Sequence, residues 1–282
     1  MYGIIESKRL NANTVMMSVL APRIAKKAGP GQFIILRINE TGERIPLTVH
    51  DTGADSGIVK IIFQEAGKTT GLLGAMKAGD YILDLVGPLG EPTPLEGYKK
   101  AAVIGGGVGA AIAYPQAKKL KELGAEVHFI CGFRSRELII LEEEAKAIGN
   151  LTVITTDDGS NGVKGFVTDA LKELLDKGNR YDAVIAAGPL PMMKFVSALT
   201  KEYGIKTIVS MCPVMIDGTG MCGGCRVTVG GKVKFACADG PDFDGHKVDF
   251  DEAIRRLSYY KEKESVSLKT HKCRMEKAVN GR

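Results

Sequence analysis

A regular alternation of short apolar runs and helical segments between residues 101 and 209 is the feature that most constrains the fold. Glycine or proline marks many of the junctions between these segments. Such an order predicts a parallel sheet whose strands are joined by right-handed helical crossovers. The expected strands are 101–104, 127–131, 152–155, 183–187 and 205–209, and the expected helices are 110–123, 138–148, 166–176 and 191–203.

The residues on either side of this segment have other patterns. Closely spaced β-rich runs with turn residues between them predict a small β-barrel or sandwich in the first hundred residues, with strands at 15–20, 33–38, 45–49, 59–64 and 81–86 and a helix at 70–77. After residue 209 a glycine- and cysteine-rich region follows. The charged tail begins at His246 and has a helical pattern over 250–264. We therefore expect a multi-domain chain with a β-barrel at 1–98, an α/β parallel-sheet domain at 99–209, a small loop domain at 210–245 and a C-terminal extension at 246–282.

Composition adds limits rather than an identity. The chain has 282 residues, which is enough for two ordinary cores, with 44% hydrophobic and 25% charged residues. The net charge of +5 comes from interspersed charges, so no nucleic-acid footprint is visible, although a basic face for an acidic electron carrier remains open. The start of the chain lacks a signal-peptide pattern, and the apolar run 101–114 is too short to span a bilayer. We expect a cytoplasmic protein without membrane association.

Three of the six cysteines form a cluster with an unusual spacing. Asp217, Cys222, Cys225 and Cys237 follow the pattern D-x4-C-x2-C-x11-C. The plant-type two-iron spacing is C-x4-C-x2-C…C, so three positions match and an aspartate stands at the first. A carboxylate can supply the fourth anionic ligand, and the intervening glycines let the backbone fold around a compact cluster. We expect these four side chains to hold a [2Fe-2S] cluster.

Other interpretations of the cysteines stay open. A zinc ion could be bound tetrahedrally by the same residues, or the loop could hold no metal. Cys212 is a rival for the fourth ligand, but it lies ten residues before Cys222 and breaks the spacing. Cys131 falls at the end of an expected strand, where a buried small hydrophobic residue is the ordinary role. Cys273 lies in the tail, and the sequence indicates no role for it.

Glycine-rich turns at the ends of the expected parallel strands indicate a nucleotide site. A pyrophosphate can approach the Gly105–Gly109 turn closely, and ligands of open sheets bind at the carboxyl ends of strands. The acidic residue that usually follows about twenty positions later is missing. Arg134 and Arg136 stand there instead, either for a 2′-phosphate or as a solvated loop. The segment 188–193 could equally be a helix start with core methionines. The candidate residues are Gly105, Gly106, Gly107, Val108, Gly109, Arg134, Asp158, Gly188, Pro189 and Met192.

The β-rich half contains a second candidate site. An arginine can pair with a phosphate, a strand-borne hydroxyl can face a ring nitrogen, and the start of the next helix can meet the same pyrophosphate. A surface arginine and a capped helix are the ordinary alternatives. The candidates are Arg44, Pro46, Leu47, Thr48, Phe63, Gly67, Lys68, Thr69 and Thr70.

Taken in order, these motifs resemble the ferredoxin–NADP reductase superfamily. The R-x-P-L-T segment at Arg44 resembles its flavin signature, and G-K-T-T at Gly67 its flavin-pyrophosphate loop. The GGGVG and GPLPMM segments resemble its nicotinamide-domain motifs, and the cysteine loop is similar to the electron-transfer subunit of dihydroorotate dehydrogenase. The resemblance covers residues 1–245 and implies FAD on the barrel and NAD(H) on the α/β domain.

Two departures point to a particular branch of this superfamily. The dihydroorotate enzyme's subunit has cysteine where this chain has Asp217, and it normally ends soon after the cluster. The aspartate and the extension are more similar to the alpha (small) subunits of NADH-dependent reduced ferredoxin:NADP oxidoreductase, some of which are called sulfide dehydrogenase subunits. That resemblance implies one FAD, one [2Fe-2S] cluster and NAD(H) on this chain. It also implies a larger iron–sulfur flavoprotein partner, similar to a glutamate synthase small subunit, that binds NADP(H) and ferredoxin.

The expected function is therefore that of an oxidoreductase subunit in which the cofactors do the chemistry and no side chain acts as a catalytic base. Electrons would pass between NAD(H), FAD and the cluster to or from the partner. Electron bifurcation is implied by the resemblance alone. One alternative is the electron-transfer subunit of dihydroorotate dehydrogenase, and another is a zinc-bearing module that senses a nucleotide. Motifs for ATP hydrolysis, zinc proteolysis and serine hydrolysis are missing from the sequence.

Overall fold

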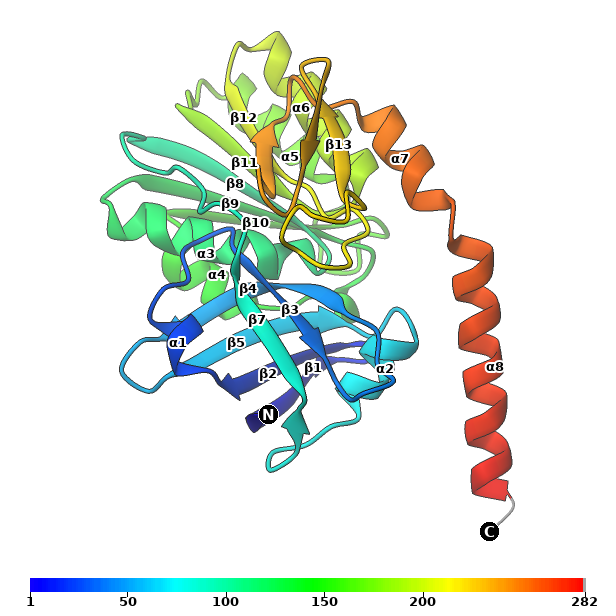
Figure 1. The fold of residues 1–282 in the computed structure, drawn as a ribbon. Coiled ribbons are helices and arrows are strands. Elements are labelled where there is room, and N and C mark those ends of the chain that lie inside the picture. Colours follow the sequence, from blue (N-terminus) through cyan, green and yellow to red (C-terminus); the bar gives the residue numbers. More distant parts are fainter. Residues whose placement is uncertain (281–282) are drawn as a thin grey trace.

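The computed structural model describes the backbone of residues 1–280 and the side chains of residues 1–270. A β-barrel built from the first hundred residues lies below an α/β unit, and the cysteine-rich segment lies beside the α/β unit with loops that extend toward the barrel (Figure 1). This arrangement confirms the expected fold class. The side chain of Cys273 lies outside the described part. No helix within the described residues is both long and apolar enough to cross a bilayer.

The barrel is a nearly closed antiparallel sheet with strand order β6-β1-β2-β5-β4-β3-β7. Its inward-facing side chains, among them Met17, Ile34, Leu36 and Phe63, form one buried core. Two short helices, α1 (Pro22–Ala25) and α2 (Lys68–Gly74), lie at its rim. The strands are β1 (Tyr2–Asn11), β2 (Thr14–Leu20), β3 (Phe33–Arg37), β4 (Ile45–Gly53), β5 (Ile58–Gln64), β6 (Tyr81–Ile82) and β7 (Asp84–Leu89).

The second sheet has the order β10-β9-β8-β11-β12-β15, and its first five strands are parallel. Its strands are β8 (Lys100–Gly106), β9 (Glu126–Phe133), β10 (Leu151–Thr156), β11 (Ala183–Ala187), β12 (Lys206–Ser210) and β15 (Asp242–Asp244). Its helices are α3 (Gly109–Glu122), α4 (Glu142–Ile148), α5 (Val167–Asp176) and α6 (Leu190–Glu202), with a 3₁₀ turn, η1 (Arg136–Leu138).

Helices cover both faces of this sheet because its strands are apolar on both sides. Ala101 and Val103 of β8 pack with residues of α3, whereas Ala102 and Ile104 pack with residues of α5 and α6. Neighbouring residues of a strand point to opposite faces, so one strand contributes to two cores. The carboxyl ends of the parallel strands point toward the barrel and the cysteine-rich segment (Figure 1).

The cysteine-rich segment is not a separate body. It contains the hairpin β13 (Arg226–Val229) and β14 (Lys232–Phe235), and it returns through β15, which pairs antiparallel with β12 of the nucleotide sheet. Helix α7 (Phe250–Ser258) then packs beside α6, and α8 (Lys261–Asn280) runs down the side of the barrel toward α2 (Figure 1).

Several element boundaries differ from the sequence expectation. The helix expected from Leu138 begins only at Glu142, because Leu141 adopts a left-handed conformation with φ of 57° that interrupts the helix. The strand expected at 81–86 is two strands, which pair with different neighbours, β1 and β3. The long first strand, β1, was not expected.

Candidate functional site

Strand β4 carries most of the candidate flavin residues. Arg44 stands exposed just before it, and Pro46, Leu47 and Thr48 are half-buried along it. Pairing with β3 sets Ile35 opposite Pro46 and Phe33 opposite Thr48. Phe33 and Ile35 belong to the core shared with the nucleotide sheet, whereas Leu47 packs against the barrel core, so neighbouring residues of β4 face opposite sides of the strand.

The start of α2 is joined to the same region by a hydrogen bond. The buried Thr69 hydroxyl donates to a Glu43 carboxylate oxygen at 2.6 Å, next to Arg44 in sequence. The Thr70 hydroxyl accepts from the N–H groups of Ala66 and Gly67, both at 3.0 Å. The structure thus brings the Arg44 segment and the Gly67–Thr70 segment together. Sequence reasoning missed Glu43, since nothing in its local pattern marks a contact 26 residues away.

Phe63 has a different position from the other candidates of the barrel. Its ring is 2% exposed and packs in the barrel core with Val15, Ile61 and Leu73. A ring that is enclosed on all sides has no free face for a flavin. The structure therefore accounts for Phe63 as a core residue.

The glycine turn after β8 is held by close backbone packing. A Cβ at Gly105 would lie 2.4 Å from the Ala110 Cα, and one at Gly109 would lie 2.2 Å from the Ala187 carbonyl oxygen. Gly107 has φ of 56°, and its N–H donates to the Gly132 carbonyl at 2.8 Å. Only glycine fits at these positions, so the turn forms the close strand–helix junction that a pyrophosphate site needs.

The structure brings the glycine turn and the 188–193 segment into contact. A Cβ at Gly106 would lie 2.4 Å from Met192 Sδ and 3.1 Å from Pro189 Cδ. Gly188 also packs on the Gly106 backbone and has φ of 154°. Met193, in contrast, is a core residue with 1% exposure. Met193 thus fits the core interpretation, whereas Met192 lies against the glycine turn.

The loops after β9 and β10 gather at the same edge of the sheet. The exposed Arg134 accepts at its carbonyl from Asp158 N–H at 3.3 Å, and Ser160 accepts from Arg136 N–H at 2.7 Å. The Ser160 hydroxyl and N–H both donate to Asp158, and these bonds lower the pKa of that carboxyl group. The edge therefore presents arginines beside a carboxylate that is already occupied by its own loop.

Two of the four candidate cluster ligands are in direct contact. Cys225 and Cys237 are 1% and 2% exposed, and their Sγ atoms lie 3.2 Å apart. Burial, followed by the contact with Cys225, raises the pKa of the Cys237 thiol to about 12. A thiol with so high a pKa keeps its proton at neutral pH unless a bound metal displaces it. Cys222 is exposed at the surface of the same loop.

Asp217 organises the loop that carries the cysteines. Its carboxylate accepts from Thr219 N–H at 2.8 Å and from Cys222 N–H at 2.7 Å. The Thr219 N–H bond, ahead of that from Cys222, keeps the pKa of this carboxyl group below its usual value. Asp217 is therefore ionised and lies beside the backbone of a candidate ligand.

The donor set of this loop suits an iron–sulfur cluster. Three thiols and one carboxylate share it, and backbone N–H groups point at sulfur: Gly224 N–H at 3.4 Å from Cys222 Sγ, and Cys237 N–H at 3.5 Å from Cys225 Sγ. Such N–H···S contacts tune bound clusters. Within the described residues, no three His, Cys, Asp or Glu side chains lie close enough to hold one metal ion. Cys225 and Cys237 are in direct contact, whereas Asp217 and Cys222 are joined to each other through the Cys222 N–H. Cys212 is exposed and outside this set of contacts.

The cluster loop packs directly on the barrel. Gly218 has φ of 77°, and a Cβ there would lie 2.8 Å from side-chain atoms of Ile35 and Leu89. Ile35 is the cross-strand partner of Pro46. The candidate cluster site and the candidate flavin strand are therefore one strand apart.

A buried carboxyl group, also missed by sequence reasoning, lies where the three units meet. Asp242 of β15 accepts from the Thr93 hydroxyl at 2.5 Å, and Gln116 of α3 lies 3.5 Å from Oδ2. Among the side chains that the structure describes, none is hydrogen-bonded to Asp242 Oδ1. Burial raises the pKa of this carboxyl group. These contacts connect the segment after β7, which carries Thr93, with α3 and β15.

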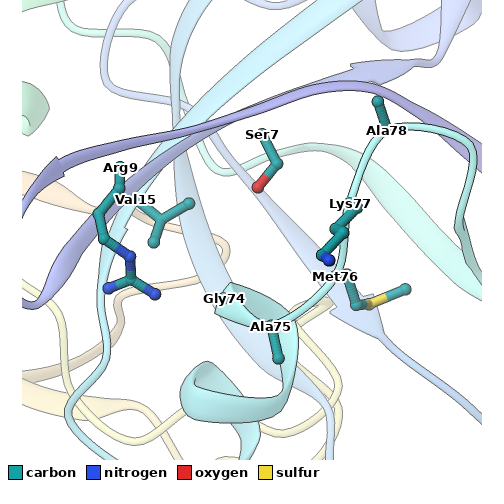
Figure 2. Close-up of a pocket in the computed structure, with 8 residues that line it drawn as sticks. All are labelled: Ser7, Arg9, Val15, Gly74, Ala75, Met76, Lys77 and Ala78. Carbon is teal, nitrogen blue, oxygen red and sulfur yellow. The ribbon is translucent and has the colours of Figure 1, made fainter.

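A separate hollow of about 560 Å³ lies between β1 and the end of α2 (Figure 2). Arg9 reaches its edge but is already paired with Glu65 at 2.8 Å. None of the candidate site residues lines it. The lining residues are Ser7, Arg9, Val15, Gly74, Ala75, Met76, Lys77 and Ala78.

Comparison with known proteins gives matches to two families of domains. The oxidoreductase NAD-binding domain family matches residues 103–198, and the iron–sulfur cluster binding domain of dihydroorotate dehydrogenase B matches residues 213–249. A ferredoxin NADP+ reductase from Neisseria gonorrhoeae with bound FAD and NADP has the same fold, with a TM-score of 0.60 over 72% of this chain and 90% of that chain at 15% identity. Fold and site thus define a ferredoxin–NADP reductase-type electron-transfer protein with an added iron–sulfur domain.

More similar proteins narrow this class. A Thermotoga maritima protein called dihydroorotate dehydrogenase B (NAD(+)), electron transfer subunit homolog, is 45% identical over 94% of this chain and 93% of its own. This chain belongs to the family of those electron-transfer subunits and their homologues. A chain from the structure of NADH-dependent reduced ferredoxin–NADP oxidoreductase, described in work on flavin-based electron bifurcation, is 42% identical with a TM-score of 0.90 over 96% of this chain and 98% of that one.

These matches confirm the expected superfamily and the oxidoreductase class, with an iron–sulfur cluster and a nicotinamide nucleotide as cofactors. Both matched domains are redox domains, which favours an electron-transfer subunit over the zinc-bearing sensor considered from the sequence.

Proposed function

We propose that this chain is the NAD(H)-handling subunit of an electron-bifurcating NADH-dependent reduced ferredoxin:NADP+ oxidoreductase, with one FAD and one [2Fe-2S] cluster. The observation that carries the proposal is the contact of the cluster loop with the barrel. Gly218 lies against Ile35, which pairs with Pro46 of the candidate flavin strand. A flavin beside β4 and a cluster in this loop would then be neighbours across a single strand.

The chain's own residues have positioning roles in this proposal. The Gly105–Gly109 turn and Met192 shape the nicotinamide nucleotide site at the carboxyl ends of β8 and β11. Arg44, which follows the Glu43 that accepts from Thr69, would offer a cation to the flavin pyrophosphate. Asp217, Cys222, Cys225 and Cys237 are the proposed cluster ligands. A bound flavin supplies the change from two-electron hydride chemistry to single-electron transfer, which a two-iron cluster can accept.

The C-terminal extension supports a role in subunit contact. Tyr259, Tyr260 and Val266 are 68%, 50% and 63% exposed along α7–α8, which projects from the side of the molecule (Figure 1). Aromatic and aliphatic side chains that are exposed on a projecting helix are typical of a surface that a partner covers. The proposed partner is a larger iron–sulfur flavoprotein, similar to a glutamate synthase small subunit, that handles NADP(H) and ferredoxin.

Anaerobic purification from the native host tests this proposal. We expect a yellow-brown complex with about two irons and one flavin per copy of this chain, plus the larger subunit with its own flavin and iron. The complex should reduce an artificial acceptor with NADH. A colourless chain that carries zinc in place of iron would contradict the proposal.

A second candidate is the electron-transfer subunit of a dihydroorotate dehydrogenase. The match of residues 213–249 to the cluster domain of that enzyme favours it. The identity of the co-purified subunit separates the two candidates. A flavin-binding barrel dehydrogenase that oxidises dihydroorotate would support the second candidate, whereas an iron–sulfur flavoprotein would support the first.

A further inference from the structure

Helix α7 follows the cluster domain and is anchored to it at several points. The Asp249 carboxylate caps the helix by accepting from Glu252 N–H at 2.8 Å, and Asp249 N–H donates to the Thr228 carbonyl of β13 at 2.8 Å. Phe250 and Ala253 are buried in the same core as Cys225 and Cys237. The helix therefore has a fixed position relative to the candidate cluster loop.

This anchoring brings one cation onto the loop itself. The half-buried Arg256 donates from Nη2 to the carbonyl oxygen of Gly224 at 3.2 Å. Gly224 stands between Cys222 and Cys225, and its N–H points at Cys222 Sγ. The residue that Arg256 holds is thus the same one that directs an N–H toward a proposed ligand.

The neighbouring Arg255 differs in this respect. It is exposed and lies near Asp251, whose pKa Lys194 lowers first and Arg255 lowers further. Both arginines suit the last turn of a helix, where cations interact favourably with the helix dipole. Of these two arginines, only Arg256 donates a hydrogen bond to the cluster loop within the described side chains. The family match of the cluster domain ends at residue 249, so it assigns no role to Arg256.

We infer that Arg256 is a positioning residue for the iron–sulfur cluster, which holds the Gly224 peptide in place and raises the cluster's reduction potential. The inference rests on the proposed function. A reduced cluster carries one more negative charge than an oxidised one, so a nearby partly buried cation stabilises the reduced form. The hydrogen bond to the Gly224 carbonyl also keeps the adjacent N–H directed at sulfur, which acts in the same direction.

The test compares Arg256→Gln, Arg256→Lys and the matched control Arg255→Gln in the holo complex. Iron content is measured first, and the midpoint potential of the cluster is then measured by redox titration followed by electron paramagnetic resonance. We expect Arg256→Gln to shift the midpoint to a more negative value than both the wild type and Arg255→Gln. Arg256→Lys, which keeps the charge, should recover part of the shift.

The outcomes separate this inference from the proposed function. Iron-free wild-type protein would overturn the proposed function itself. Wild-type protein with a normal cluster, together with Arg256→Gln at an unchanged midpoint and full iron, would overturn the role of Arg256 alone. An equal shift in Arg255→Gln would also overturn it, since the effect would then be one of general charge. Loss of iron in Arg256→Gln supports the role if Arg256→Lys retains iron, and contradicts it if Arg256→Lys loses iron as well.

Discussion

The Sγ atoms of Cys225 and Cys237 lie 3.2 Å apart, although a complete hairpin separates the two residues. The register of that hairpin, with Arg226 opposite Phe235, places the cysteines that flank it side by side. A hydrogen bond from Ala236 N–H to the Cys225 carbonyl continues the pairing. Two of the proposed thiolate ligands are therefore positioned by strand pairing.

This contact predicts which cysteines hold iron. Cys225→Ser or Cys237→Ser should reduce the iron content from about two per chain to near zero, because serine is a poor ligand for a cluster of this kind. Iron analysis and the visible spectrum of anaerobically purified protein measure the effect. Cys212→Ser is the matched control, since Cys212 is exposed and outside the contacts of the loop. A Cys212 variant without iron would show that the fourth ligand was assigned to the wrong residue.

Asp217 is the second point at which ligand identity can be tested. Asp217→Cys should retain about two irons and shift the midpoint potential, because a thiolate is a softer and more covalent ligand than a carboxylate. Redox titration with optical detection measures the shift. An unaltered potential and spectrum would mean that Asp217 only organises the loop through its bonds to Thr219 and Cys222.

The contact between Gly106 and Met192 predicts a nucleotide-binding defect. In Gly106→Ala the new Cβ would lie 2.4 Å from Met192 Sδ and 3.1 Å from Pro189 Cδ, so the Met192 side chain must move away from the turn. We expect KM for NADH to rise about tenfold, which corresponds to roughly 1.4 kcal/mol. Flavin and iron content should not change. The double variant Gly106→Ala/Met192→Ala should recover part of the affinity, and failure to recover any would argue against the contact.

The buried Asp242 predicts a particular dependence of stability on pH. Its pKa is raised in the folded protein, so its contribution is fully present below the unfolded-state pKa and is lost as pH rises through the folded-state pKa. We expect thermal stability to decline as pH rises from the unfolded-state pKa through the raised folded-state pKa, and Asp242→Asn to flatten that decline. Differential scanning calorimetry at several pH values measures it.

A matched control lies on the same strand. Asp244 has a lowered pKa, with hydrogen bonds from Lys247 and His246 N–H outweighing its partial burial. Asp244→Asn should therefore leave the decline attributed to Asp242 intact. The same profile in wild type and Asp242→Asn would show that the Asp242 carboxyl is hydrated or paired.

Local sequence patterns predicted elements whose signals are themselves local. The strand Ala183–Ala187 has the expected bounds, because an apolar run between two turns needs little else. Strand β1 was missed because it carries exposed charged residues such as Glu6, Lys8 and Arg9, so its run is not apolar. Strand β15 has three residues, two of them aspartates, and exists only because β12 offers it a partner.

The candidate site divides in the same way. Spacing alone indicated Cys222, Cys225 and Cys237, and glycine turns indicated Gly105–Gly109, since these motifs are contiguous. The roles of Glu43, Asp242 and Arg256 depend on contacts over 26, 149 and 32 residues, respectively, and no short pattern encodes such distances.

The pairing of β15 with β12 limits how the cysteine-rich segment can be removed or moved. Because the return strand occupies the border of the nucleotide sheet, removal of everything after Ser210 would expose a naked hydrogen-bonding edge on β12. The segment that carries the proposed cluster ligands is thus held by strand pairing and is not joined to the nucleotide domain by a linker alone. An outward movement of this segment would require the three residues of β15 to lose their pairing with β12.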